Sequence, residues 1–469
     1  MLSTNRLKGI ILIIVDALRH DSLIELIKLG KANTLRRLMS RGINFNTCFS
    51  LTNATDPSVT TIMSGLHPLN HGVINHGEKV TASELRRARY LTFLSDILTN
   101  KGWFNIGLDI LERWHTKGFD IYLSTTRGNI RAKYSWLLSN LKYGHLKLFL
   151  RNIGLRLQIT KHIWEPIFSY YQDAHILVDM AIRYIRLAIK KKRNFFVLLH
   201  FWSTHIPYYA NTYKNFGPLC YKKYKNICDK DFRNVLLHTA HVKRRRYLNK
   251  WGKFRKYKKI FNVISDYYSS IIHVDDAIHK LLDSLCFEGI LDETLIVLTA
   301  DHGESLVEHE IFFDHHGLYD VSIRVPLIFY SGSINRASTN NTALHVDILP
   351  TLLEMLDIHT EFQFDGINLN KVLNDEVPDR PVVSIETYTE KKIGIRWNGY
   401  KYIRSLNLKN AICRYCGKIH GGLRELYDLN ADPNETKNII RESRKIEQKF
   451  IEKFKREIIK FRVKTALKS

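Results

Sequence analysis

The chain has 469 residues, 45% of them hydrophobic, and it carries a formal net charge of +25. A chain of this length can bury a sizeable core, which fits a large soluble enzyme of two or three domains. Its apolar runs are short and interrupted by charge, so none reaches the roughly 18 to 20 residues that a membrane span needs.

The N-terminal apolar run from Ile10 ends at Asp16, and no small-residue cleavage site follows it. Secretion is therefore not expected. The cysteines are too few and too scattered for a disulfide framework, which favours a reducing cytoplasm. We predict a cytoplasmic protein that can also lie at the membrane periphery. The cysteines are Cys48, Cys220, Cys228, Cys286, Cys413 and Cys416.

Three apolar runs of strand type, residues 10–15, 195–199 and 295–298, lead directly into acids or histidines. The polar residues at or just after these runs are Asp16, His200, His205, Asp301 and His302. The carboxyl ends of strands in an open α/β sheet form one edge, and ligands bind there. We expect a metal or anion site at this edge, although His200, inside its run, fits the core better.

Strands and helices alternate from residue 10 to residue 329, with helices at 173–191 and 266–285 before two of the strands. This order predicts a doubly wound, mostly parallel α/β sheet with helices on both faces. We assign residues 1–332 to this catalytic domain. Residues 333–469 predict a small α+β subdomain, with a hairpin around Asn398-Gly399 and a closing helix at 435–463.

A second segment of interest begins at Thr55, which precedes Asp56-Pro57-Ser58. Proline suits the first turn of a helix, so Thr55 is expected at or near a helix N-terminus. Free backbone amides and the helix dipole favour an oxyanion at that position. The alternative is a threonine that only caps the helix.

Two basic segments and one segment with cysteine and histidine offer further candidate binding sites. Residues 243–259 hold ten Lys or Arg and no acid, with aromatic residues interleaved, and residues 145–164 are also basic and amphipathic. Such segments suit an anionic membrane or a polyanion, with a solvated insertion as the alternative. No nucleic-acid recognition motif accompanies them. Cys413, Cys416 and His420 offer three zinc ligands, with a metal-free hairpin pair as the alternative.

Taken together, these segments resemble the sulfatase family of the alkaline phosphatase superfamily. Asp16 lies in IIVDALRHDSL, and Thr55-Asp56-Pro57-Ser58 fits the family's C/S/T-x-P-S nucleophile pattern. The motifs FWSTHIPY, TADHGES and DHHGLYD follow in the family's order. The resemblance runs from about residue 8 to about residue 440, and the stretches near 125–165 and 210–260 look like insertions.

The resemblance implies an alkaline phosphatase or sulfatase-like fold and a divalent metal ion, which can be Mg, Mn, Ca or Zn. It implies Asp16, Thr55, Asp301 and His302 as metal ligands, with Thr55 also the nucleophile. It places His205 and either His315 or His316 where the family keeps substrate or leaving-group residues, and His76 where relatives bind substrate. The spacing of Asp275, Asp276 and His279 allows a second metal, whereas the resemblance favours a structural role for Asp275.

Departures from the family pattern narrow the expected substrate. Most sulfatases place Cys or Ser at the nucleophile position and Arg four residues later, for conversion to formylglycine, where this chain has Thr55 and Val59. The usual second aspartate is Ala17. We therefore expect cleavage of an anionic phosphate ester through Thr55, in the manner of the superfamily's phosphodiesterases and phosphotransferases. The alternatives are a sulfatase without formylglycine and an inactive protein that binds anionic glycans or lipids.

Overall fold

The computed structural model describes residues 7–124, 173–225, 227–232, 234, 257–377, 380–405, 407–414 and 417–466. Its largest feature is a nine-stranded sheet with the order β4-β3-β5-β1-β6-β8-β2-β7, in which β9 also pairs with β2. The strands are β1 (Gly9–Val15), β2 (Ile43–Phe49), β3 (Phe104–Asp109), β4 (Ile121–Ser124), β5 (Phe195–Phe201), β6 (Thr294–Thr299), β7 (Arg324–Val325), β8 (Leu327–Tyr330) and β9 (Ala337–Leu344).

The central strands run parallel. β1 pairs in parallel with both β5 and β6, so that Ile11 lies opposite Val197 on one side and Ile296 on the other. β3 and β4 extend the parallel part, whereas β8 pairs antiparallel with both β6 and β2. Every residue of β1 is buried, as expected for a strand covered on both faces. The predicted fold class is confirmed.

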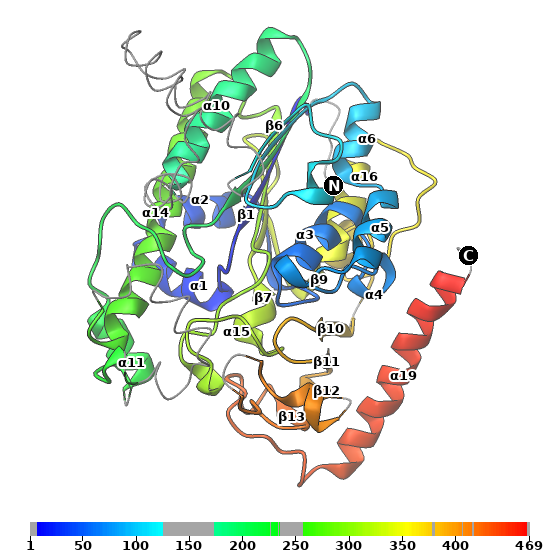
Figure 1. The fold of residues 1–469 in the computed structure, drawn as a ribbon. Helices are drawn as coiled ribbons and strands as arrows, with labels where there is room; N and C mark the ends of the chain where they lie inside the picture. The colour runs from blue at the N-terminus through cyan, green and yellow to red at the C-terminus, as the bar shows by residue number, and fades with distance from the viewer. Residues whose placement is uncertain are drawn as a thin grey trace, which may run out of the picture.

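Helices cover both faces of the sheet (Figure 1). One face carries α1 (His20–Lys28), α2 (Asn33–Arg41), α10 (Ala174–Lys190) and α14 (Ile260–Phe287), and the other carries α3 (Thr55–Ser64), α4 (Pro68–His71), α5 (Ala82–Tyr90), α6 (Leu94–Asn100) and α16 (Ile348–Met355). The long helix α14 presents a buried line at intervals of three and four residues, which is the spacing of one helical face. The line comprises Ile264, Tyr267, Ile271, Val274, Ile278, Leu281 and Leu285.

A second, antiparallel sheet lies below the carboxyl edge of the first in Figure 1. Its strands are β10 (Val382–Glu386), β11 (Lys392–Trp397), β12 (Tyr400–Ser405) and β13 (Arg424–Asp428). Asn398 and Gly399 turn between β11 and β12 with φ of 49° and 75°, which confirms the predicted hairpin and suits a two-residue turn with positive φ. The predicted domain boundary at residue 332 precedes β9, which belongs to the large sheet.

The closing helix, α19 (Arg444–Ala466), begins later than the predicted residue 435. Asp432 holds the chain in a turn by accepting hydrogen bonds from the backbone N–H of Lys437 and the hydroxyl of Thr436. Phe450 of α19 packs against Tyr402 of β12, which fixes the helix on the small sheet. The remaining short α-helices of the described residues are α11 (Gly217–Tyr224), α15 (Asp320–Ile323), α17 (Asn370–Leu373) and α18 (Leu408–Ala411).

The basic segments at 145–164 and, except for its last three residues, 243–259 lie outside the described residues. Cys416 also lies outside them. Cys220 and Cys228 form a disulfide bond, which the cysteine spacing did not predict and which does not match a reducing cytoplasm. A cytoplasmic location therefore stays a prediction. Within the described part of the chain, none of the helices has the length and hydropathy required to cross a membrane.

Candidate active site

Asp16, Asp301 and His302 meet at the carboxyl edge of the large sheet. Asp16 directly follows β1, while Asp301 and His302 follow its parallel neighbour β6. One ligand atom of each residue lies within 4.8 Å of the other two. Nε2 of His302 is 3.2 Å from Oδ2 of Asp301 and 3.8 Å from Oδ1 of Asp16. The structure thus brings together three of the four residues predicted as metal ligands.

Backbone amides orient the carboxylate of Asp301. Its Oδ1 atom accepts hydrogen bonds from the backbone N–H of Ala17 at 3.1 Å and of His302 at 2.8 Å. Ala17 makes this contact with φ of 59°, a left-handed conformation that is uncommon for a residue with a Cβ atom. Ala17, which stands where the resemblance places a second aspartate, therefore contributes its backbone N–H to the site and no carboxylate.

His302 is held as a neutral imidazole. Its Nδ1–H donates to the carbonyl of Gly303 at 2.8 Å, so the lone pair of Nε2 faces the two carboxylates. Burial lowers the pKa of His302 to about 3, although the hydrogen bond to Gly303 opposes this shift. Neutral imidazole is the form that binds a metal ion.

The carboxylate oxygens of this cluster fit a cation. Among the described residues, none donates a hydrogen bond to either oxygen of Asp16 or to Oδ2 of Asp301, and all three atoms are buried. Burial, together with the charges of Asp301 and Glu304, raises the pKa of Asp16 well above its ordinary value. A cation among these atoms would remove that cost. Two carboxylates and one imidazole suit Mg²⁺, Mn²⁺, Ca²⁺ or Zn²⁺.

Thr55 adjoins this cluster as the first residue of α3. Its Oγ1 atom is 3.3 Å from Nε2 of His302, and the residue is 3% exposed. Pro57 lies in the first turn of α3, as expected from the sequence. The hydroxyl of Thr55 therefore lies at a helix N-terminus and within reach of the candidate metal ligands.

His76, predicted to bind substrate, lies against the residue that follows Thr55. Its Nδ1 atom is 2.9 Å from Oδ2 of Asp56, which also pairs with Arg113 at 2.6 Å and His115 at 3.2 Å. Although burial would raise it, His76 and His115 hold the pKa of Asp56 well below its ordinary value. The side chain of His76 is 23% exposed, so part of it reaches solvent.

His205 and His315 lie beside His302. The ring of His315 stacks on that of His302 with centroids 4.2 Å apart, and the ring of His205 is 6.0 Å from that of His315. Nδ1–H of His205 donates to the carbonyl of Ile206 at 2.7 Å, and Nδ1–H of His315 donates to that of Asn53. Burial lowers the pKa of His205 to about 4 and that of His315 to about 3. Both rings are therefore neutral at physiological pH.

His316, the alternative to His315, belongs to a different group of side chains. Its Nδ1 atom is 3.3 Å from Oδ1 of Asp314, and its Nε2 atom is 3.7 Å from Sγ of Cys413. Its ring centroid is 5.3 Å from that of His420. Although burial would lower it, Asp314 and Cys413 raise the pKa of His316 well above its ordinary value. Of the two adjacent histidines, His315 is the one whose ring stacks on a candidate metal ligand, His302.

The pair Asp109 and His200 also reaches the site, although the sequence favours a core position for His200. Nδ1 of His200 is 2.7 Å from Oδ1 of Asp109, and its Nε2 is 3.9 Å from Oδ2 of Asp16. Although burial would lower it, the charge of Asp109 raises the pKa of His200. Asp109 ends β3, so it carries the same signal as Asp16: an acid at the end of an apolar strand.

Two of the three candidate second metal ligands, Asp275 and His279, have other partners. Asp275 accepts hydrogen bonds from the backbone N–H of Leu35 at 2.7 Å and of Thr34 at 3.2 Å, at the start of α2. His279 pairs with Asp283 at 3.5 Å on the exposed side of α14. These contacts support the structural alternative for Asp275.

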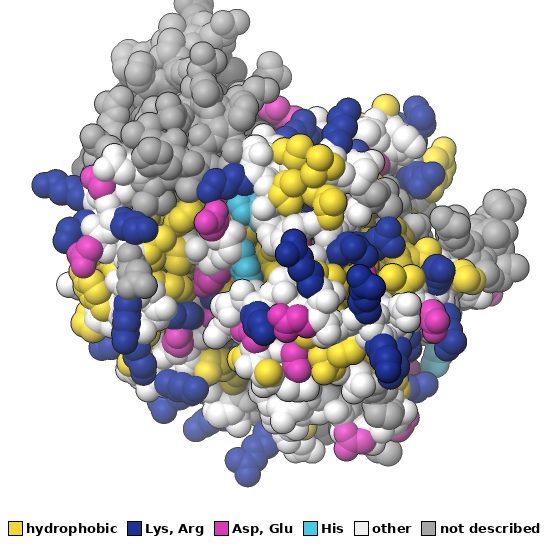
Figure 2. Space-filling model, turned by 90° about the horizontal axis from the view of Figure 1, so that it is seen from below, with side chains coloured by type: hydrophobic (Ala, Val, Ile, Leu, Met, Phe, Trp, Pro, Cys, Tyr) yellow, Lys and Arg dark blue, Asp and Glu magenta, His cyan; other side chains and the backbone are white. Residues whose placement is uncertain are grey.

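Seen from below in Figure 2, Lys and Arg side chains spread over the face, and histidine side chains reach the surface near its middle.

Comparisons with known proteins match most of the chain. Residues 8–358 match the Sulfatase family, and residues 307–464 match the C-terminal family of N-sulphoglucosamine sulphohydrolase. N-acetylglucosamine-6-O-sulfatase of Bacteroides thetaiotaomicron is 32% identical over 187 residues, which cover 37% of this chain and 31% of that relative. This chain covers about a third of the length of several curated relatives: 31% of the N-acetylglucosamine-6-O-sulfatase and 32% of each of two others.

Other relatives extend over the whole chain. The multifunctional alkaline phosphatase superfamily protein PehA of Trinickia caryophylli is 22% identical over 495 residues, covering 92% of this chain and 91% of that relative. The structure of a phosphonate monoester hydrolase from Silicibacter pomeroyi superposes with a TM-score of 0.67 at 16% identity, over 97% of this chain and 95% of the other. The resemblance read from the sequence motifs is confirmed: the chain belongs to the sulfatase family, within the alkaline phosphatase superfamily.

Proposed function

We propose that this chain is a metal-dependent ester hydrolase or transferase that cleaves a phosphate ester through Thr55. The observation that carries the proposal is a threonine hydroxyl at the N-terminus of α3, 3.3 Å from His302. A hydroxyl in that place can act as a nucleophile when a cation and neighbouring bases activate it.

The side chain of Thr55 also decides against the chemistry of most sulfatases. Oxidation of a cysteine or serine gives formylglycine because the Cβ atom bears no carbon substituent, and the methyl group of threonine prevents formation of that aldehyde. Four residues on, Val59 is fully buried in α3, where an arginine would have to stand. An unmodified hydroxyl suits phosphoryl transfer, in which the attacked atom passes to the nucleophile and is released in a second step.

In this proposal Asp16, Asp301, His302 and the hydroxyl of Thr55 hold one divalent ion. When bound, the ion supplies positive charge that favours the deprotonated hydroxyl and neutralises the ester's non-bridging oxygens. Oγ1 of Thr55 forms a bond to phosphorus while the bond to the leaving oxygen breaks, and the proton of the Thr55 hydroxyl passes through His205 or His315 to the leaving oxygen. Water or an acceptor alcohol then attacks phosphorus while the bond from phosphorus to Oγ1 breaks, and the proton of the attacking group passes to Oγ1, which restores the hydroxyl of Thr55.

His205 and His315 are the candidates to move protons in these steps. Each ring holds its Nδ1–H on a backbone carbonyl, so Nε2 is the atom that exchanges a proton with substrate. With pKa values of about 4 and about 3, both rings begin as proton acceptors. Binding of an anionic ester raises the pKa of a nearby imidazole, so protonation of the leaving oxygen requires substrate in place. We assign this role to these two residues and not to His316.

The proposed substrate and the proposed partners are anionic. The substrate is an anionic ester on a sugar, a lipid or a small molecule, and a sulfate ester is the second candidate because relatives such as N-acetylglucosamine-6-O-sulfatase carry that activity in their names. The basic segments at 145–164 and 243–259 remain candidates for contact with a membrane or polyanion.

A substrate panel tests the proposal. Purified protein is assayed on an aryl phosphate monoester, a phosphodiester, a phosphonate monoester and an aryl sulfate, each with Mg²⁺, Mn²⁺, Ca²⁺ or Zn²⁺. We expect kcat/KM to be highest for one of the phosphorus esters. A higher value for the sulfate than for every phosphorus ester would overturn the assignment, and no turnover of any ester would favour the inactive binding protein.

A further inference from the structure

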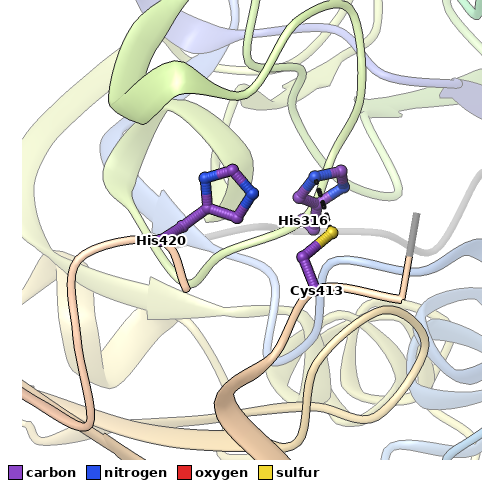
Figure 3. Close-up of side chains that lie close together, drawn as sticks. All are labelled: His316, Cys413 and His420. Atoms are coloured by element: carbon purple, nitrogen blue, oxygen red, sulfur yellow. Dashed lines mark hydrogen bonds between the residues drawn. The ribbon is translucent and has the colours of Figure 1, made fainter. Parts of the chain in front are cut away.

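Asp16, Asp301 and His302 are called here the catalytic cluster. A second group of side chains of the kinds that bind metals lies outside it. It consists of His316, Cys413 and His420, called here the His–Cys–His cluster, and one ligand atom of each lies within 4.8 Å of the other two. Cys413 and His420 come from the loop between α18 and β13, whereas His316 comes from the segment before α15. Figure 3 shows the three side chains pointing toward one another from these two parts of the chain.

The distance between Cys413 and His316 matches two ligands of a tetrahedral zinc ion. Sγ of Cys413 is 3.7 Å from Nε2 of His316. A zinc ion with bonds of about 2.3 Å to sulfur and about 2.0 Å to nitrogen separates those two ligands by roughly 3.6 Å. Cys413 and His316 therefore need little movement to bind one ion, and a ligand atom of His420 lies within 4.8 Å of both.

The outer nitrogen of each ring faces an oxygen atom, so Nε2 is the nitrogen on the side of the cluster. His420 donates its Nδ1–H to the carbonyl of His309 at 3.0 Å, and Nδ1 of His316 faces Asp314 at 3.3 Å. A carboxylate or carbonyl on the far nitrogen is the usual outer partner of a histidine that binds zinc, because it fixes the tautomer and the ring orientation. Each histidine of the cluster has such a partner.

Backbone hydrogen bonds hold the described part of the loop that carries two of the ligands. Ile412 and Ile419 form an antiparallel bridge, and Cys413 accepts a hydrogen bond from the backbone N–H of Gly417 at 2.8 Å while donating its own N–H to Lys418 at 2.7 Å. This turn brings Cys413 close to His420. Burial is also nearly complete: Cys413 is 1%, His316 2% and His420 3% exposed.

We propose that the His–Cys–His cluster binds Zn²⁺ at a site separate from the catalytic metal. Thiolate and imidazole together favour zinc over Mg²⁺ or Ca²⁺, which prefer oxygen ligands. The fourth position of a tetrahedral ion remains for water or another side chain. Because His316 directly follows His315, the ion would fasten the loop of the small sheet to the segment that reaches the catalytic cluster.

Cysteine alkylation in the full chain tests the zinc site without relying on activity. The protein is treated with a chelator and a phosphine reductant, divided, and exposed to iodoacetamide with or without added Zn²⁺. Trypsin cleavage after Lys409 and Arg414 isolates Cys413 in a peptide of its own, which mass spectrometry quantifies. We expect zinc to slow modification of Cys413 at least about tenfold, because a metal-bound thiolate is withdrawn from reaction. The exposed Cys286 should react equally in both samples.

Variants assign the protection to this site. His420→Ala should abolish the protection of Cys413, whereas His359→Ala, at a histidine whose side chain is 92% exposed, should not. Asp314→Asn should weaken zinc binding by about 10- to 100-fold, the usual effect of removing a ligand's outer partner. Asp301→Ala removes a candidate ligand of the catalytic ion and should leave the protection of Cys413 intact. The alkylation test therefore reports on the zinc site whether or not the protein cleaves a phosphate ester.

Three outcomes would overturn the proposal: equal modification of Cys413 with and without zinc, protection that survives His420→Ala, or protection lost in Asp301→Ala. If His420→Ala does not fold, the test on the unsubstituted protein still decides. Substitution with Co²⁺ gives an independent readout there, since a thiolate ligand produces a near-ultraviolet charge-transfer band that cobalt on oxygen and nitrogen ligands lacks. Absence of that band in a cobalt complex of the unsubstituted protein would also overturn the site.

Discussion

The catalytic cluster and the His–Cys–His cluster are alike in burial and in the closeness of their ligand atoms, but they are built in different ways. Asp16, Asp301 and His302 follow adjacent strands of one parallel ladder. His316 and Cys413 are 97 residues apart and come from irregular segments, one beside each sheet. Strand register fixes the first cluster, whereas packing of two loops fixes the second.

This difference decides what the sequence can reveal. A polar residue at the end of a buried strand must lie at the carboxyl edge of the sheet, because the strand's direction is set by its neighbours. A loop residue carries no such constraint. The catalytic cluster can therefore be predicted from the sequence, while the partnership of His316 with Cys413 and His420 appears only in the structure.

The largest expected effect separates the two clusters by metal content. Asp301→Ala or His302→Ala should abolish binding of the catalytic ion and turnover, because each removes a ligand held at a strand end. Both variants should keep the zinc of the His–Cys–His cluster. Metal content by elemental analysis and kcat/KM on a small ester measure the two effects. Asp179→Ala, at a position of α10 whose side chain is 57% exposed, is the control and should change neither. An unchanged catalytic metal content in both variants would remove these residues from the site.

The next effect separates metal binding from chemistry within the catalytic cluster. Thr55→Ala should lower turnover by at least about 10³-fold and keep the ion, since two carboxylates and His302 remain. Thr55→Ser should retain measurable activity, because only a hydroxyl is required. Mass spectrometry of acid-quenched reactions should find a phosphoryl group on the peptide that carries Thr55. Full activity of Thr55→Ala would end the covalent mechanism.

A smaller effect concerns His200, which faces Asp16, and Asp109, which orients His200. Asp109→Asn should weaken catalytic metal binding by about 10- to 100-fold, because Asp109 orients His200, whose Nε2 lies 3.9 Å from Asp16. His200→Gln should give a similar loss. Metal titration followed by activity gives the affinity, and turnover at saturating metal should recover. Loss of turnover that saturating metal does not restore would place Asp109 in the chemistry itself.

Much of the fold and of the catalytic cluster is readable from the sequence because short-range patterns specify it. Pro57 predicts the start of α3 and so the place of Thr55, and Asn398-Gly399 predicts its hairpin. What escapes is decided by tertiary contacts. His200 resembles a core residue until Asp109 is placed beside it, and the sequence cannot tell that His315 and His316, one residue apart, face different clusters.

The smallest expected effect tests the ionic contact that ties the two strand ends of the catalytic cluster together. Arg19, which lies 1% exposed after β1, pairs with Glu308 after β6 at 2.8 Å. Although burial would raise it, the charge of Arg19 lowers the pKa of Glu308 to about 2. Because this pKa lies below the value of about 4.3 in an unfolded chain, Glu308 stabilises the fold above that pH, and the stabilisation is lost as the pH falls through about 2. Glu308→Gln should therefore lower the free energy of unfolding at pH 7 by about 1 to 3 kcal/mol, and the difference from the unsubstituted protein should shrink between about pH 4.3 and pH 2.

Glu310→Gln is the control for this prediction. The side chain of Glu310 is 69% exposed beside Lys418, where solvent screens the pair, so denaturant unfolding should show a change below about 0.5 kcal/mol. A pH-independent difference for Glu308→Gln would mean that packing, and not the charge of Glu308, joins the two strand ends.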